Sequence, residues 1–281
     1  MNPVVGIIAQ GQMGAAVASR LTRNGRTVLT VLEGRSAQSV KRAKEAGMKS
    51  VGLQEFCQSD IILSIVPPRD AAHLAQSLAP HLASARKKPI YVDCNAVSPA
   101  TVERIAAIVE ATGAGFVDGG IIGGPPKAGY AGPTFYLSGE RADAVAALND
   151  HGLECKLLDG GIGAASALKM SYAGITKGLT ALASVMILAA SRAGMGQALH
   201  RELAASQPAL LEWFERQVPS MFPKAYRWVA EMEEIAGFAA PDEAGAALME
   251  STARFYARLA ADVADAKTET DILARFFESK G

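Results

Sequence analysis

The sequence predicts a doubly wound α/β domain followed by an all-α domain, with a long helix joining the two. Up to about Leu158, short β-branched runs alternate with amphipathic stretches, which is typical of parallel βαβ units. After Gly163 the strand pattern stops and alanine-rich helical sequence begins. We therefore expect two domains, over residues 1–162 and 163–281.

The elements of the first domain are bounded by local signals. Ser98-Pro99, for example, places an N-capping side chain before a proline in the first helical position, which marks a helix start. On such grounds we expect strands over 4–8, 27–32, 60–66, 89–93 and 115–118, and helices ending near 23, beginning at 36, spanning 71–83 and beginning at 98.

The second domain is divided by prolines and glycines. The long helix that begins at 164 ends at Arg192, because a basic last turn is followed there by Gly194. Further helices are expected to begin at Pro208, after Pro223 with an end by Gly237, and at 241–243.

The composition excludes several classes of partner. Lysine plus arginine and aspartate plus glutamate number 28 each, so no general charge favours nucleic acid or an anionic membrane. Cys57, Cys94 and Cys155 are widely spaced among apolar residues, which predicts buried, reduced thiols in a cytoplasmic protein. The uncharged stretch 178–190 is shorter than the roughly 20 apolar residues that span a bilayer, so we expect a buried helix. No export signal is visible, and no metal site is predicted.

A glycine-containing turn follows the first strand and opens the first helix. Its sequence is Ala9-Gln10-Gly11-Gln12-Met13-Gly14. Gly11 and Gly14 suit the close approach of backbone to a pyrophosphate, and the helix N-terminus offers free N–H groups. Ala9 replaces the first glycine of the usual fingerprint, but the surrounding βαβ pattern supports a Rossmann-type dinucleotide site formed by Gly11, Gln12, Met13 and Gly14.

The end of the second strand carries two conflicting signals about the dinucleotide. Glu33 lies where an acid holds the ribose hydroxyls of NAD. Arg35 and Ser36 follow, and a guanidinium with a hydroxyl at a helix start suits the 2′-phosphate of NADP. We favour NADP, with NAD as the alternative. The later cations Lys41, Arg42 and Lys44 are interpreted as a solvated helix face.

Further motifs follow the glycine turn. They are Asp93-Cys94-Asn95, the run 115–124, then Ala128, Tyr130 and Gly132-Pro133, and the run from Gly163 to Lys169-Met170. Together with the turn they resemble, in order and spacing, the β-hydroxyacid dehydrogenases, which include relatives of 3-hydroxyisobutyrate and 6-phosphogluconate dehydrogenase. The resemblance covers the first domain and the joining helix, and beyond about 195 the chain looks like a branch with a distinct C-terminal helical domain. We assign Val66, Pro67 and Asn95 to the cofactor site alongside the glycine turn.

The resemblance implies that Lys169 works at the substrate hydroxyl and that Ile122, Gly123 and Gly124 line the substrate pocket. The chemistry is sensible, because an alcohol releases hydride only as its O–H proton leaves, and an amine can take that proton. In the reducing direction the ammonium donates a proton to the carbonyl oxygen. Tyr172 and Thr176, on the same helix, are candidates for hydrogen bonds to substrate, and Lys177 is an outside candidate.

Three departures from the family pattern narrow the substrate. Ala173 replaces an asparagine, and Ile122 replaces a serine. Thr176 and Ser166 stand where the 6-phosphogluconate enzymes carry a glutamic acid and a histidine, so that substrate is excluded. A pocket with an apolar wall favours a substrate with an apolar or aromatic part. Tyr226, Arg227, Trp228 and Glu231 of the C-terminal region are further candidates, for which helix packing is the alternative.

The leading hypothesis is therefore a dehydrogenase or reductase for a β-hydroxy acid or related alcohol. Two alternatives are an imine reductase on the same scaffold and a non-catalytic NADP-binding module. The expected partners are a small-molecule substrate and, from the family analogy and the long apolar helix, a second copy of the chain.

Overall fold

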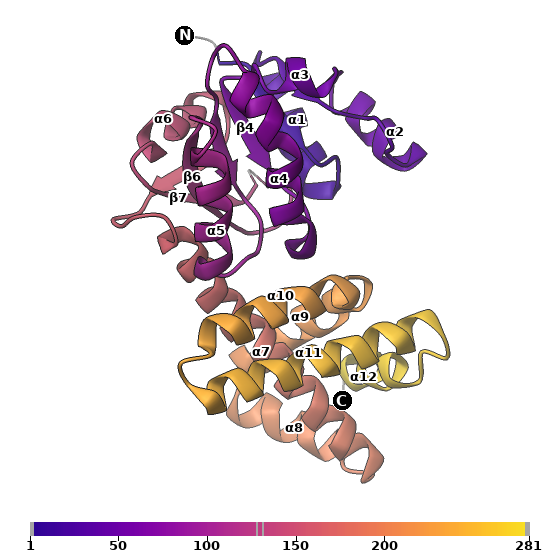
Figure 1. The fold of residues 1–281 in the computed structure, drawn as a ribbon. Coiled ribbons are helices and arrows are strands. Elements are labelled where there is room, and N and C mark those ends of the chain that lie inside the picture. The colour runs from indigo at the N-terminus through magenta and orange to yellow at the C-terminus, as the bar shows by residue number, and fades with distance from the viewer. Residues whose placement is uncertain (1–2, 128, 131, 279–281) are drawn as a thin grey trace. The chain divides into compact units, whose positions relative to one another are not determined.

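The computed structural model describes residues 3–127, 129–130 and 132–278, and it consists of two compact units (Figure 1). The units cover Met1–Met170 and Ser171–Gly281, so they divide within the long helix α7 (Ala164–Arg192). The sequence placed this division at 162/163, ahead of the helix. The first turns of α7 belong to the first unit because they are hydrogen-bonded to its sheet.

The first unit is built on a mixed sheet with the strand order β3-β2-β1-β4-β5-β6-β7-β8. All neighbouring strands are parallel except β6 and β7, which are antiparallel. This confirms the predicted fold class, but β3, β7 and β8 were not among the predicted strands. The strands are β1 (Val5–Ile8), β2 (Val28–Thr30), β3 (Lys49–Ser50), β4 (Ile61–Ser64), β5 (Ile90–Asp93), β6 (Gly115–Ile122), β7 (Thr134–Ser138) and β8 (Glu154–Leu157).

Helices cover both faces of this sheet because its central strands are apolar on both faces (Figure 1). Val5 and Ile7 of β1 pack into one core with α1 and α2, whereas Ile8 packs into the other with α4 and α5. Ser98 accepts a hydrogen bond from the Thr101 amide, so the predicted start of α5 is confirmed. The helices are α1 (Gln12–Arg23), α2 (Ala37–Glu45), α3 (Leu53–Phe56), α4 (Pro68–Ser84), α5 (Pro99–Glu110) and α6 (Ala142–Ala146), with a 3-10 turn η1 (Ala147–His151).

The second unit is helical throughout its described part. Helices begin at the predicted prolines or close to them, and α10 runs slightly past its expected end at Gly237. α8 and α12 were not predicted as separate helices. Besides the greater part of α7, the elements are α8 (Gly196–Ser206), α9 (Pro208–Met221), η2 (Phe222–Lys224), α10 (Ala225–Ala239), α11 (Glu243–Ala264) and α12 (Thr268–Glu278).

Polar contacts join three helices inside this unit. Lys177 of α7 forms an ion pair with Glu231 of α10, and both side chains are 12% exposed. The Lys177 ammonium also lies 5.0 Å from the centre of the Trp228 ring. Tyr256 of α11 donates a hydrogen bond to the Lys177 carbonyl at 2.6 Å. Trp228 and Glu231 therefore have packing roles within the helical unit.

Two sequence expectations concern buried groups. Cys57, Cys94 and Cys155 are buried free thiols, as expected, and burial raises the pKa of Cys57 and of Cys155 to about 12. Residues 178–190 were expected to form a buried helix, but they belong to the 29-residue helix α7, in which Leu182 and Met186 are 61% and 54% exposed. Among the described helices α7 is the one long and apolar enough to cross a membrane, by length and composition alone.

Candidate cofactor and substrate site

The glycine turn leaves the N-terminus of α1 open. Gly11 is the N-cap residue, no side chain caps this helix end, and a Cβ added at Gly11 would meet nothing within 4 Å. The first N–H groups of α1 are thus available to an anion. Gly14 is buried, and a Cβ there would collide with the carbonyl oxygen of Ala9. Gln12 is exposed and Met13 packs against the core, so the turn fits a pyrophosphate through its backbone.

Sheet register gathers the predicted site residues of the first unit at one edge. Ile8 pairs with Ser64, Ser64 with Asp93, and Asp93 with Asp118. The segments that follow these strands all leave the sheet at its carboxyl edge, where open α/β sheets bind ligands. They are the glycine turn, Val66-Pro67 and Asn95, whereas β6 continues in the sheet to Ile122 before Gly123 and Gly124 follow it.

The Asn95 side chain forms hydrogen bonds with other residues of the protein. Its Oδ1 accepts a hydrogen bond from the Val66 amide at 2.6 Å, and its Nδ2 donates to Ser64 and Asp93 at 2.9 Å. The buried amide therefore ties the ends of β4 and β5 together. Val66 is half-buried and Pro67, which precedes α4, is exposed. Asn95 thus fixes the position of the segment that we predicted to contact a cofactor.

The residues expected to select the dinucleotide lie between β2 and α2. Glu33, Arg35 and Ser36 are all exposed, and neither Glu33 nor Arg35 forms an ion pair with another described residue. Ser36 caps α2 by accepting a hydrogen bond from the Ser39 amide at 3.3 Å.

Arg42, which we interpreted as part of a solvated face, lies against the glycine turn. It is half-buried, and its Nε donates to the Gln10 carbonyl oxygen at 2.8 Å. Gln10 itself is fully buried and donates from Nε2 to Thr30 and, at 3.1 Å, to the Val31 carbonyl. The interpretation of Arg42 was wrong because the helical pattern of α2 did not show that this residue contacts the glycine turn at Gln10. The one available signal was its spacing from the cap Ser36 and from Ser39, which puts all three near one side of the first turns.

The base of the Lys169 side chain, on α7, lies next to Gly120 of β6. A Cβ on Gly120 would lie 2.8 Å from the Ala165 carbonyl oxygen and 3.3 Å from the Lys169 Cβ. β6 continues through this glycine, beyond the end at 118 that the sequence predicted, and the missing side chain lets α7 cross it closely. Lys169 is half-buried.

A buried carboxylate anchors the first turn of α7. Asp118 accepts hydrogen bonds from the amides of Gly163 and Ser166 at 3.0 and 2.9 Å, and from the Ser166 hydroxyl at 2.7 Å. Ser138 of β7 also donates to it, and accepts from the Ala165 amide at 3.0 Å. Burial raises the pKa of Asp118, and these hydrogen bonds oppose that rise. This anchor was missed by the sequence reasoning, although an aspartate before paired glycines was a signal for it.

The predicted substrate-pocket residues follow at the end of β6. Ile122 is half-buried, and Gly124 is exposed, with nothing within 4 Å of where a Cβ would lie. Gly123 has φ +120, and a Cβ on it would meet the Tyr130 hydroxyl at 2.7 Å and Pro133. Glycine is therefore required at 123. Ala128 lies outside the described residues.

Tyr172 and Thr176 lie further along α7, in the second unit. Tyr172 is half exposed, and Thr176 donates its hydroxyl proton to the Tyr172 carbonyl at 2.9 Å. Tyr226 is 66% exposed, and the Arg227 guanidinium lies 5.7 Å from the centre of its ring. These side chains remain candidates on the helical unit.

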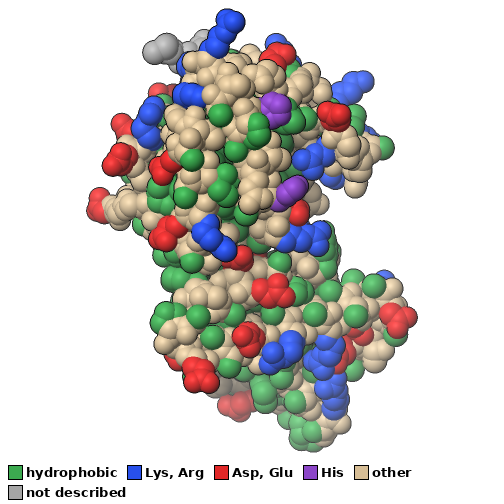
Figure 2. All heavy atoms as spheres, viewed as in Figure 1, with side chains coloured by type: hydrophobic (Ala, Val, Ile, Leu, Met, Phe, Trp, Pro, Cys, Tyr) green, Lys and Arg blue, Asp and Glu red, His purple; other side chains and the backbone are tan. Residues whose placement is uncertain are grey.

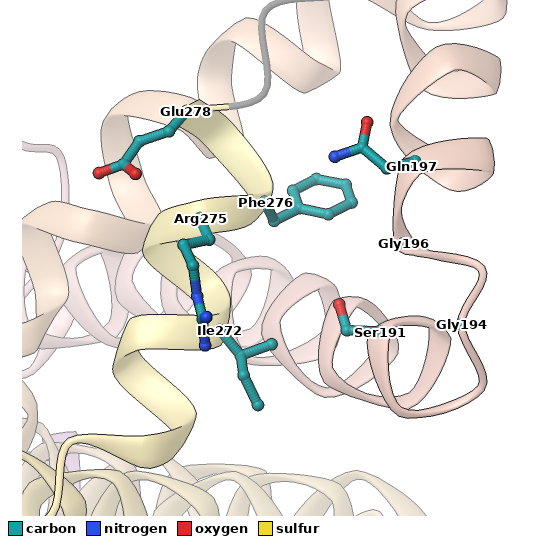
Figure 3. Close-up of a pocket in the computed structure, with 8 residues that line it drawn as sticks. All are labelled: Ser191, Gly194, Gly196, Gln197, Ile272, Arg275, Phe276 and Glu278. Atoms are coloured by element: carbon teal, nitrogen blue, oxygen red, sulfur yellow. The ribbon is translucent and has the colours of Figure 1, made fainter.

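A separate hollow of about 570 Å³ lies in the helical unit (Figure 3). Ser191, Gln197, Ile272, Arg275 and Phe276 are among its lining residues, which come from α7, α8 and α12. None of the predicted site residues lines it. In the described part of the chain, no cluster of His, Cys, Asp and Glu side chains suits a metal ion. Figure 2 shows acidic and basic side chains interspersed over the visible face, in keeping with the balanced charge.

Family-level similarity covers most of the first unit and much of the second. The model of the NAD binding domain of 6-phosphogluconate dehydrogenase matches residues 4–150, more than half of the chain, and a domain of unknown function (DUF1932) matches residues 190–259. The chain therefore belongs to the family that carries this NAD-binding domain, a family of NAD(P)-dependent dehydrogenases and reductases.

Two curated relatives match in sequence. An uncharacterized 28.5 kDa protein of Methanothermus fervidus is 29% identical over 68% of this chain and 72% of its own length. The mitochondrial 3-hydroxyisobutyrate dehydrogenase of Drosophila melanogaster is 28% identical over 54% of this chain and 46% of its own length.

Solved structures reproduce the two-part fold. A conserved protein of unknown function, described as similar to 3-hydroxyacid dehydrogenases, is 29% identical with a TM-score of 0.70 and covers 94% of this chain and 98% of its own. The 3-hydroxyisobutyrate dehydrogenase of Mycobacterium tuberculosis has a TM-score of 0.75 at 19% identity, with both chains fully covered. An imine reductase of Myxococcus stipitatus has a TM-score of 0.58 at 20% identity over 98% of this chain and 99% of its own. The last two likenesses establish the fold.

Proposed function

We propose that this protein is an NADP-dependent oxidoreductase that interconverts a β-hydroxy acid or related alcohol and its carbonyl compound, with Lys169 as the general acid and base. The observation that carries the proposal is the placement of Lys169 over Gly120, beside the sheet edge at which the glycine turn also lies. A proton-transfer group and a dinucleotide-binding turn thus belong to one ligand-binding edge.

The nicotinamide dinucleotide supplies or accepts the hydride when it is bound. The open N-terminus of α1 at Gly11 would hold its pyrophosphate, and the segment at Val66 and Pro67, positioned by Asn95, would contact its nicotinamide half. Arg35 and Ser36 follow β2, where the adenosine ribose binds in this type of fold, and their charge and hydroxyl favour a 2′-phosphate over a free hydroxyl.

Lys169 handles the substrate oxygen in either direction. As an ammonium it donates a hydrogen bond and then a proton to the carbonyl oxygen, and as an amine it accepts the hydroxyl proton. Its Cβ lies close to Gly120 of β6, and the residue is half-buried. Ile122 gives the pocket an apolar wall, which supports a substrate with an apolar or aromatic part. Gly123 and Gly124 are proposed to complete the substrate contacts made by the first unit.

Replacing Lys169 tests this assignment. The variant Lys169→Met keeps the stem and removes the amine, so turnover of a carbonyl substrate with NADPH should fall by about 10²–10⁴-fold. The affinity for NADPH, measured by fluorescence titration, should stay within a factor of three or so of wild type, because the turn does not depend on this amine. Lys49→Met, at an exposed position on the edge strand β3, is the matched control and should leave both quantities unchanged. Wild-type turnover by Lys169→Met would overturn the mechanism.

The substrate class is tested by a screen with NADPH over ketones, β-keto acids and imines. We expect turnover of carbonyl compounds. Imine reduction alone would instead support the alternative that the Myxococcus stipitatus relative suggests. Cofactor binding without turnover of any compound would support the non-catalytic module.

We further propose a cytoplasmic homodimer without membrane or nucleic-acid partners. The helix α7 presents exposed apolar side chains at alternating spacings of four and three residues, which suits packing against an identical helix. They are Leu168, Tyr172, Ile175, Leu179, Leu182 and Met186. Charged residues do not interrupt this stripe, so a second copy is complementary to it. Light scattering should give the mass of two chains, and a monomer that partitions into lipid vesicles would instead favour a membrane surface.

A further inference from the structure

Arg42 is held in place by two contacts in the protein. Its Nε donates to the Gln10 carbonyl oxygen at 2.8 Å, and its Nη2 donates to the Ser39 hydroxyl at 3.3 Å. The first contact joins α2 to the glycine turn across 32 residues of sequence. The guanidinium thus stands between the turn and the N-terminal part of α2.

The positive charge of Arg42 is not neutralised by a carboxylate of the described chain. Both of its contacts are to neutral oxygen atoms, and it forms no ion pair there. Glu45, three positions further along α2, lies near Lys41 instead, and Glu33 is exposed without an ion pair. A half-buried guanidinium has five N–H donors and uses only some of them here, so it can bind a further anion.

One hydroxyl group contacts this guanidinium, and a second hydroxyl adjoins the first. The Ser39 hydroxyl lies 3.3 Å from Arg42 Nη2 and 3.2 Å from the Ser36 hydroxyl, which caps α2. A phosphate monoester offers several strong acceptor oxygens and two negative charges, which match a guanidinium with neighbouring hydroxyl donors. A ribose hydroxyl offers neither.

We propose that Arg42, together with Ser39 and Ser36, is the main determinant of NADP over NAD, by binding the 2′-phosphate of the adenosine ribose. This inference rests on the proposed function, in which NADP is the cofactor. Arg35, the residue that local sequence favours, is exposed and makes no described side-chain contact, so binding a phosphate would have to immobilise it. Arg42 is already anchored on the turn, and less conformational freedom is lost when it binds.

The test measures cofactor binding rather than turnover. Dissociation constants for NADPH, NADH, 2′,5′-ADP and 5′-AMP are determined by calorimetry for wild type, Arg42→Ala, Arg35→Ala and Lys44→Ala. Arg42→Ala should weaken NADPH and 2′,5′-ADP by about 10- to 100-fold, and change NADH and 5′-AMP by less than about threefold. Arg35→Ala should weaken NADPH by only a few fold, by the same argument from preorganisation. Lys44→Ala removes the same charge from an exposed position of α2 and should have almost no effect.

Each outcome separates this inference from the proposed function. Equal weakening of NADPH and NADH by Arg42→Ala would show that the residue only supports the turn, and would overturn the inference. A loss of NADPH affinity confined to Arg35→Ala would also overturn it, but would leave the preference for NADP intact. Wild-type protein that binds NADH as tightly as NADPH would refute the preference itself. Arg42→Lys keeps the positive charge but not the paired N–H donors of the guanidinium, so it should restore part of the 2′-phosphate affinity. This variant also controls for misfolding of Arg42→Ala.

Discussion

The close approach of α7 to the sheet makes Gly120 the most informative position for substitution. In Gly120→Ala, the new Cβ would lie 2.8 Å from the Ala165 carbonyl oxygen and 3.3 Å from the Lys169 Cβ. Neither obstacle is the free end of a side chain, so the helix must move away from β6. Restoring an ordinary contact of 3.4 Å to the carbonyl oxygen requires a shift of about 0.6 Å, from 3.4 minus 2.8.

The expected magnitudes follow from this shift. Overpacking a tight contact costs about 1–3 kcal/mol, and the entropy that alanine removes from the unfolded chain offsets roughly 0.4–1 kcal/mol. We expect a net loss of about 1–2 kcal/mol in the free energy of unfolding of the first unit. A displacement of this size at Lys169 should lower kcat by about 10-fold, because a misplacement of 1 Å costs on the order of 100-fold. The affinity for NADPH should not change.

Urea denaturation, steady-state kinetics and cofactor titration measure the three quantities. Gly237→Ala is the control, because it makes the same chemical change in α10 where nothing lies within 4 Å of the new Cβ. It should raise stability by up to about 1 kcal/mol through helix propensity, and leave kcat unchanged. If the urea midpoint and the kcat of Gly120→Ala both equal those of wild type, the close contact between β6 and α7 at Gly120 is refuted.

Two further predictions concern the helical unit. Lys177→Met removes the cation that pairs with the mostly buried Glu231 carboxylate and should lower the free energy of unfolding by about 3–5 kcal/mol. The double variant Lys177→Met/Glu231→Leu should recover most of this loss, and a double variant no more stable than the single one would contradict the prediction. Burial of Asp262 opposes its ionisation, but hydrogen bonds from Thr270 and Glu269 outweigh burial and lower its pKa. A carboxyl group whose pKa is lower in the folded state stabilises the fold at pH values above its ordinary pKa, and this stabilisation is lost as the pH falls. In urea denaturation, wild type should therefore be more stable than Asp262→Asn at pH 7, and this advantage should shrink by pH 3. An advantage independent of pH would count against the capping role.

Local sequence determined the fold class and the cofactor turn. The β-branched run of β1, the glycines that follow it and the amphipathic α1 are adjacent in the chain, so their pattern is visible without tertiary information. The same holds for the start of α5 at Ser98-Pro99, where cap and proline act within one turn. The change from strand to helix signals after Gly163 was likewise a local property, and it predicted the helical second part.

Strand direction and the end of the first unit were decided by contacts distant in sequence. β7 runs antiparallel to β6, and no local signal distinguished this from another parallel strand. The Asp118 carboxylate binds Ser166 across 48 residues, and this contact places the first turns of α7 with the sheet rather than with the helices.

Lys169 and Arg42 show the same division within the candidate site. The family resemblance of the motif at 163–170 predicted that Lys169 acts at the substrate hydroxyl. The position of Lys169 over Gly120, however, follows from how β6 and α7 pack. Arg42 resembled any basic residue of a surface helix until folding brought α2 against the turn at Gln10. Sequence by itself therefore determined which elements form and which chemistry they carry, because periodicity, caps and glycine turns are local. Tertiary structure decided which side chains meet, because hydrogen bonds and close approaches between distant residues exist only in the folded chain.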